Sequence, residues 1–157
     1  MITDLLHSAQ ARGILIATAE SCTGGMVAAA ITDIAGSSAI FDRGFVTYSN
    51  AAKMDMLDVQ ASTLDAYGAV SEQVAAEMAK GAVINSGAEL AVSITGIAGP
   101  GGSDHKPEGR VCFGLHFKGH TSTSTIEFGP LGRDSVREDA KTEALRLLLS
   151  AIKANAE

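Results

Sequence analysis

Several short turns of this sequence carry small hydroxyl or thiol side chains that could act as nucleophiles. They are Ser21, Cys22, Ser37, Ser38 and Ser49. A serine hydroxyl is inert without a neighbouring base, and none of these turns contains a histidine. The sequence therefore offers no local support for a Ser-His-Asp triad, and another kind of residue must take the proton.

Lys53 is the candidate for that base, because of where it falls in an expected helix. If Ser49 or Asn50 caps the helix, Lys53 lies in its first turn, where the helix dipole disfavours an ammonium group. This position lowers the pKa of the lysine, and burial would lower it further. The plain alternative is a solvated surface lysine tolerated at small cost.

The longest segment without periodicity is the glycine-rich stretch 96–109, which holds five of the 17 glycines and two of the three prolines. It is not a phosphate-binding P-loop, since Gly102 stands where the motif needs lysine, and it does not fit the GxGxxG dinucleotide pattern. In so small a domain we expect such a loop to form a mobile wall of an active site; the alternative is a flexible loop without a ligand.

Composition excludes several other classes of function. The net charge of −6 and 4% aromatic residues argue against binding to nucleic acid or to an anionic membrane. The four histidines show no metal-ligand spacing and there is no CxxC, so we expect no metal. Two cysteines cannot form a disulfide framework, and no secretory signal is visible at the start, so we expect reduced thiols and a cytoplasmic protein.

The order of the elements predicts a single α/β domain over residues 1–157, with three α/β/α layers around a mixed sheet. We expect helices near 3–12, 26–32, 50–57, 60–67, 71–85 and 134–154, and strands near 14–19, 40–48, 90–94, 110–117 and 121–128. The last two strands alternate around Lys118-Gly119-His120 and predict an antiparallel hairpin, which argues against an all-parallel sheet.

Five segments carry a resemblance to a known family. They are Thr18-Ala-Glu-Ser-Cys-Thr-Gly-Gly25, Gly36-Ser-Ser-Ala-Ile-Phe-Asp-Arg-Gly-Phe-Val-Thr-Tyr-Ser-Asn-Ala-Ala-Lys53, Gly68-Ala-Val-Ser71, Ser93-Ile-Thr-Gly-Ile-Ala-Gly-Pro-Gly-Gly102 and Lys106-Pro-Glu-Gly109. In this order they resemble the CinA C-terminal domain family, whose stand-alone members are nicotinamide-nucleotide amidohydrolases. The resemblance spans essentially the whole chain.

The resemblance implies hydrolysis of the carboxamide of nicotinamide mononucleotide (NMN) to nicotinate mononucleotide and ammonia, in pyridine nucleotide recycling. It implies no metal and no organic cofactor. It assigns the serine nucleophile to Ser38, the catalytic tyrosine to Tyr48 and the lysine to Lys53. Lys53 would then take the proton from Ser38 directly or through Tyr48.

The resemblance also implies a substrate-binding set. Thr95, with either Arg137 or Arg133, would hold the 5′-phosphate, for which a guanidinium fork has matching geometry. Ser21 and Gly96 are further candidates for substrate contact. For Ser21 we rank a tight packing turn first, substrate contact second and nucleophilic attack last, because no base lies within its own turn.

Two rival functions remain open from the sequence. The first is a non-catalytic nucleotide-binding or partner-docking domain, and the second is an amidase with the same chemistry on a different pyridine or nucleotide substrate. The small apolar residues on the helices permit close packing of subunits, and we expect a homo-oligomer that acts on a small molecule.

Overall fold

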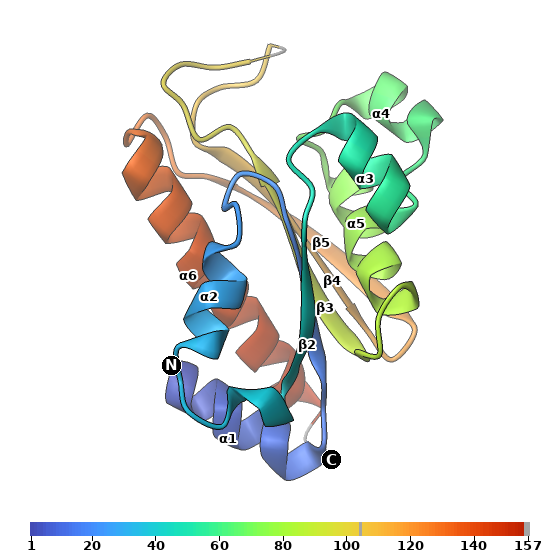
Figure 1. Cartoon of the computed structure of the whole chain (residues 1–157). Helices are drawn as coiled ribbons and strands as arrows, with labels where there is room; N and C mark the ends of the chain where they lie inside the picture. The colour runs from blue at the N-terminus through green and yellow to red at the C-terminus, as the bar shows by residue number, and fades with distance from the viewer. Residues whose placement is uncertain (104, 156–157) are drawn as a thin grey trace.

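A five-stranded sheet runs through the molecule in the order β2-β1-β3-β4-β5 (Figure 1). The computed structural model describes residues 1–103 and 105–155. The strands are β1 (Ile16–Glu20), β2 (Phe41–Val46), β3 (Leu90–Gly96), β4 (Arg110–Phe117) and β5 (His120–Glu127). β1 pairs in parallel with β2 and β3, whereas β3–β4 and β4–β5 are antiparallel, so the predicted mixed sheet is confirmed.

Helices cover both faces of the sheet, as predicted. They are α1 (Ile2–Arg12), α2 (Met26–Thr32), α3 (Asn50–Leu57), α4 (Ala61–Tyr67), α5 (Glu72–Ile84) and α6 (Arg133–Ala154). α1, α2 and α6 pack together on one face, and α3, α4 and α5 on the other (Figure 1). Alternate residues of β3 feed two separate cores: Leu90, Val92 and Ile94 face α6, while Ala91 faces α5 with Met78. The three-layer α/β/α architecture is thereby confirmed.

The parallel half of the sheet gathers three chain segments at one edge. The carboxyl ends of β1, β2 and β3 all point to this edge, because the three strands are parallel. From β1 the chain crosses to α2 on one face, and from β2 it crosses to α3 on the other. Crevices beyond the carboxyl ends of such strands are the usual ligand sites of α/β sheets.

Local sequence signals fix α3 at this edge. The hydroxyl of Ser49 accepts a hydrogen bond from the Ala52 backbone N–H at 3.0 Å, so the residue that caps the helix is Ser49 and Asn50 is its first helical residue. At the other end α5 approaches closely, since a Cβ at Gly81 would overlap the backbone carbonyl of Leu57. Lys53 therefore stands in the first turn of a helix held at both ends.

Some predicted boundaries were wrong by a few residues, with physical causes. The first strand begins at Ile16 rather than Ile14, because the Ile14 backbone N–H still donates to the Ala9 carbonyl (3.0 Å) as α1 ends. His120 is not a turn residue but pairs with Phe117 in the ladder. The hairpin turn is Lys118-Gly119 alone, with φ of 54° and 75°, the left-handed backbone of a two-residue turn.

A short 3₁₀ turn, η1 (Ser37–Ala39), lies between α2 and β2. No helix in the described part of the chain is long and apolar enough to cross a bilayer.

Candidate active site

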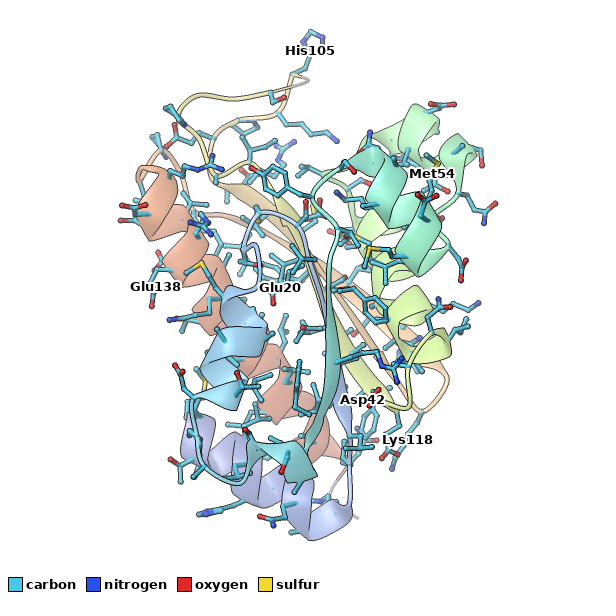
Figure 2. The ribbon with its side chains drawn as sticks, viewed as in Figure 1. Glu20, Asp42, Met54, His105, Lys118 and Glu138 are labelled. Carbon is cyan, nitrogen blue, oxygen red and sulfur yellow. The ribbon has the colours of Figure 1, made fainter. Side chains whose placement is uncertain are left out.

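The turn between β1 and α2 places Ser21 at the shared edge of the parallel strands. Its backbone N–H donates to the Ile94 carbonyl of β3 at 2.9 Å. The preceding residue, Glu20, is fully buried beside the start of α2 (Figure 2). Its carboxylate accepts hydrogen bonds of 3.0–3.2 Å from the backbone N–H groups of Gly25, Val27 and Ala28. The turn is therefore fixed to the sheet on one side and to α2 on the other.

Lys53 reaches this turn from the opposite layer. Its side chain is buried, with 1% of the residue exposed, and its Nζ lies 3.1 Å from Ser21 Oγ and 2.9 Å from the Thr47 carbonyl oxygen. No carboxylate forms an ion pair with Lys53 within residues 1–103 and 105–155. Burial lowers the pKa of Lys53, an effect that the nearby Cys22 partly opposes.

A neutral Lys53 amine suits this arrangement of partners. It keeps an N–H to donate to the Thr47 carbonyl, and it has a lone pair that can accept the Ser21 hydroxyl proton. A candidate nucleophile and a candidate base thus lie within hydrogen-bond reach, the basic requirement for an activated serine. The pair joins residues 32 positions apart in the chain.

Ser21 and Lys53 open into a pocket of about 330 Å³, a size typical of sites for small molecules. The other polar and small residues of its wall include Tyr48, Asn50, Ala69, Thr95, Gly96 and Arg133. The glycine-rich loop forms one side of this pocket, and His105 lies at the outer tip of the loop (Figure 2). Asp104, in the same stretch 96–109, lies outside the described residues.

Arg133, the first residue of α6, closes the rim of the pocket. Its guanidinium donates to the carbonyl of Gly99 in the loop (2.6 Å) and to the hydroxyl oxygen of Tyr48 (2.9 Å). Tyr48 itself is 63% exposed. The rim thus joins three segments: the end of β2, the glycine-rich loop and the start of α6.

The sequence profile of the CinA C-terminal domain matches residues 1–152. The chain belongs to this family. The nicotinamide-nucleotide amidohydrolase PncC of Enterobacter agglomerans is 56% identical over 142 residues, which cover 89% of this chain and 86% of the relative. The protein of the same name from Escherichia coli strain K12 is 54% identical over 140 residues, covering 88% and 85%. The crystal structure of the competence/damage inducible protein CihA from Agrobacterium tumefaciens superposes with a TM-score of 0.92 at 45% identity, covering 97% of this chain and 93% of that one.

In this CinA-family chain Ser38 does not meet Lys53. Ser38 is an exposed residue of η1, at the amino end of β2, whereas Thr47 and Lys53 follow its carboxyl end. Figure 2 shows Asp42, just after η1, toward the opposite end of the strands from the loop tip at His105. Six extended residues of β2 separate the two ends by roughly 20 Å at about 3.3 Å per residue. The expected Ser38–Lys53 pairing is therefore corrected: the serine that contacts Lys53 is Ser21.

The two arginine alternatives take different places. Arg133 lines the pocket, whereas Arg137, one turn further along α6, donates to the carbonyls of Cys22 (3.0 Å) and Thr23 (3.4 Å). Arg137 thus holds the outer side of the β1–α2 turn. Of the two, Arg133 is the guanidinium with access to a ligand in the pocket.

Tyr48 and Thr95 line the pocket, but the Tyr48 hydroxyl does not contact Lys53, and the Thr95 hydroxyl, expected to help hold the 5′-phosphate, is used by a backbone carbonyl of the chain. The Tyr48 hydroxyl pairs with Arg133, and only its backbone carbonyl lies near Lys53 Nζ, at 3.5 Å. The Thr95 hydroxyl is buried and donates to the Ala69 carbonyl at 2.9 Å. Gly96 lines the pocket beside it.

From the sequence, nucleophilic attack ranks below packing and substrate contact among the roles of Ser21, because no base lies within its own turn. The signal that could have found it is topological: Ser21 ends one parallel strand, and Lys53 begins the helix after the neighbouring one. In the described part of the chain there is no group of three or more His, Cys, Asp or Glu side chains that could hold a metal ion.

Proposed function

We propose that this chain hydrolyses the carboxamide of NMN to nicotinate mononucleotide and ammonia, with Ser21 as the nucleophile and Lys53 as the base. The observation that carries the proposal is the contact of 3.1 Å between a buried lysine amine and a serine hydroxyl at the wall of a pocket. The reaction itself is supported by the names of the two relatives more than 50% identical to this chain.

In the first half-reaction neutral Lys53 takes the hydroxyl proton of Ser21 as its Oγ attacks the carboxamide carbon. The tetrahedral intermediate collapses when the protonated Lys53 returns the proton to the amide nitrogen. Ammonia leaves, and the nicotinoyl group remains on Ser21 as an ester.

In the second half-reaction a water molecule replaces ammonia. Lys53, neutral again, takes a proton from this water as its oxygen attacks the ester carbon. Collapse releases nicotinate mononucleotide as the carboxylic acid, which loses its remaining proton to solvent, and Lys53 returns the proton that it took from water to Ser21 Oγ. The proton transfers to and from Ser21 therefore pass through one amine, and Tyr48 is not needed as a relay.

The β1–α2 turn supplies the donors for the oxyanion. Within the described residues the backbone N–H groups of Cys22 and Thr23 donate to no protein acceptor. The peptide group between Cys22 and Thr23 is planar, so its N–H points away from its carbonyl, which Arg137 holds on the α6 side. The N–H is thus directed away from α6, and we assign it, with that of Cys22, to the charge that develops on the carboxamide oxygen.

Arg133 is the residue that we assign to the 5′-phosphate. Two of its five N–H groups are used by Gly99 and Tyr48, which leaves donors for a ligand. In a chain with a net charge of −6, a phosphate needs a local positive group of this kind. Thr95 then contributes to the pocket wall near the β3 end rather than to the phosphate.

The test is release of ammonia from NMN by the purified protein in the presence of EDTA, together with mass spectrometry of an acid-quenched reaction. We expect stoichiometric nicotinate mononucleotide and a nicotinoyl-ribotide ester on the peptide that contains Ser21. No ammonia from NMN, with ammonia from another pyridine amide, would favour the amidase with a different substrate. Substrate binding without turnover of any amide would favour the non-catalytic domain. A homo-oligomer, a cytoplasmic location and a place in pyridine nucleotide recycling stay predictions.

A further inference from the structure

The carboxylate of Glu108 joins two chain segments at the rim of the pocket. One oxygen accepts a hydrogen bond from the backbone N–H of Gly101 in the glycine-rich loop, at 2.7 Å. The other accepts from the backbone N–H of Gly132, directly before α6, at 3.1 Å. Bonds from N–H groups to a carboxylate are stronger than those to a neutral acceptor, and a negative charge is favoured at the start of a helix.

The loop is shaped to receive this side chain. Gly99 has a φ of +92°, a backbone conformation that L side chains rarely adopt, and a Cβ there would lie 2.8 Å from Cγ of Glu108. Glycine at position 99 thus lets the Glu108 side chain lie against the loop backbone. The same Gly99 offers its carbonyl oxygen to Arg133.

Glu108 as a hydrogen-bond acceptor and Arg133 as a donor therefore connect the same two segments, the glycine-rich loop and the start of α6. Glu108 accepts from the loop at Gly101 and from the α6 start at Gly132, and Arg133, the next residue, donates back to the loop at Gly99. This closed ring of contacts fixes where the Arg133 guanidinium stands relative to the pocket. None of the hydrogen bonds of Glu108 involves Ser21 or Lys53.

We infer that Glu108 is a positioning residue that sets the glycine-rich loop and Arg133 for the phosphate end of the substrate, without a part in the bond-making steps. This inference rests on the proposed function. It predicts that loss of the carboxylate weakens binding of a phosphorylated substrate and leaves the chemistry on the bound substrate nearly intact.

The experiment compares Glu108→Gln with Glu127→Gln as a matched control. Glu127 is a half-exposed acid on β5 whose carboxylate pairs with Arg110 and accepts no hydrogen bond from residues 96–103 or 105–109. For Glu108→Gln we expect KM for NMN to rise roughly tenfold, with kcat within about threefold of the parent. Nicotinamide riboside, which lacks the phosphate, should be hydrolysed with unchanged kcat/KM, and Glu127→Gln should match the parent on both substrates.

A double-mutant cycle with Arg133→Ala separates positioning from general loosening of the fold. If Glu108 acts through Arg133, Glu108→Gln should cost less than about twofold in KM when added to Arg133→Ala. Equal losses on NMN and the riboside, a fall in kcat alone, or fully additive effects in the cycle would each overturn the inference. Failure of the parent protein to hydrolyse NMN would instead overturn the proposed function, so the two failures are distinguishable.

Discussion

The β1–α2 turn with Lys53 and the glycine-rich loop with Arg133 face each other across one pocket but are built in opposite ways. The turn is buried and held by backbone hydrogen bonds, the Glu20 carboxylate and Arg137. The loop is more exposed: backbone hydrogen bonds hold it where it leaves and rejoins the sheet, and long side chains hold its outer part. The difference indicates which part of the site needs a precise geometry. Proton transfer between two side chains requires positions fixed to a fraction of an ångström, whereas binding of the rest of the substrate tolerates a pocket wall that moves.

The contacts of Lys106 show how long side chains hold the outer part of the glycine-rich loop. Its Nζ donates to the carbonyls of Tyr67 (2.7 Å) and Val70 (2.5 Å), which joins the outer part of the loop to the α4–α5 connection. A few side-chain contacts of this kind stand in place of the packed core around the β1–α2 turn, so we expect the loop to open at a lower cost in free energy than the turn. Substitutions in the turn should therefore affect kcat, and substitutions in the loop should affect KM.

The largest effect is expected at the nucleophile. Ser21→Ala should lower kcat/KM for NMN by at least about a thousandfold, because Ser21 carries the only hydroxyl among the described residues that hydrogen-bonds to Lys53 Nζ. Ser38→Ala is the matched control, since it removes the same atom from an exposed turn at the far end of β2, and it should stay within about twofold of the parent. The activity of both variants is measured as the rate of ammonia release from NMN. An inactive Ser38→Ala protein with an active Ser21→Ala protein would reverse the assignment.

The next effect concerns the charge state of Lys53. Arginine keeps a positive charge but cannot lose its proton near working pH, so Lys53→Arg should lose activity about as badly as Lys53→Ala, by roughly a hundredfold or more. Burial lowers the pKa of Lys53, so the neutral base forms below the usual lysine range. In the parent protein kcat/KM should therefore rise with pH and level off at a pH below 10.5, the ordinary value for lysine.

The control for this pH profile is Lys80→Ala, which removes an exposed lysine of α5 and should leave both the rate and the profile unchanged. Substantial activity in Lys53→Arg, with a profile like that of the parent, would mean that Lys53 only binds substrate and that another group takes the proton.

The sequence predicted the layers of this fold better than the pairings within its site. Periodicity, caps and turn residues are local signals, and they predicted α3 with a cap at Ser49 or Asn50, of which the structure has Ser49. The contact between Ser21 and Lys53 depends instead on the order of strands β1 and β2 in the sheet, which no local pattern encodes. The family resemblance pairs Lys53 with Ser38, 15 positions earlier in the sequence, but strand β2 lies between these two residues, and the serine that contacts Lys53 in the structure is Ser21.

The two arginines of α6 provide the third prediction, which separates binding from chemistry. Arg133→Ala removes a charge-assisted contact to phosphate worth about 1.5–3 kcal/mol, so KM for NMN should rise by roughly tenfold or more while the riboside is unaffected. Arg137→Ala should instead lower kcat on both substrates, because it releases the carbonyls that orient the β1–α2 turn. Steady-state kinetics on the two substrates measures both effects. The reverse pattern would assign the phosphate to Arg137.

The smallest effect is expected at Cys22, which lies next to the nucleophile and yet takes no part through its side chain. Burial raises the pKa of the Cys22 thiol to about 11, so at pH 7.5 the thiol stays protonated and the thiolate that alkylating reagents need is scarce. The backbone N–H that we assign to the oxyanion is retained by alanine. Cys22→Ala should therefore keep kcat/KM within about twofold, and the parent protein should resist iodoacetamide at pH 7.5 for as long as it stays folded. Rapid inactivation with the label on Cys22 would show that the β1–α2 turn opens to solvent. It would contradict the conclusion that this turn is more rigid than the glycine-rich loop.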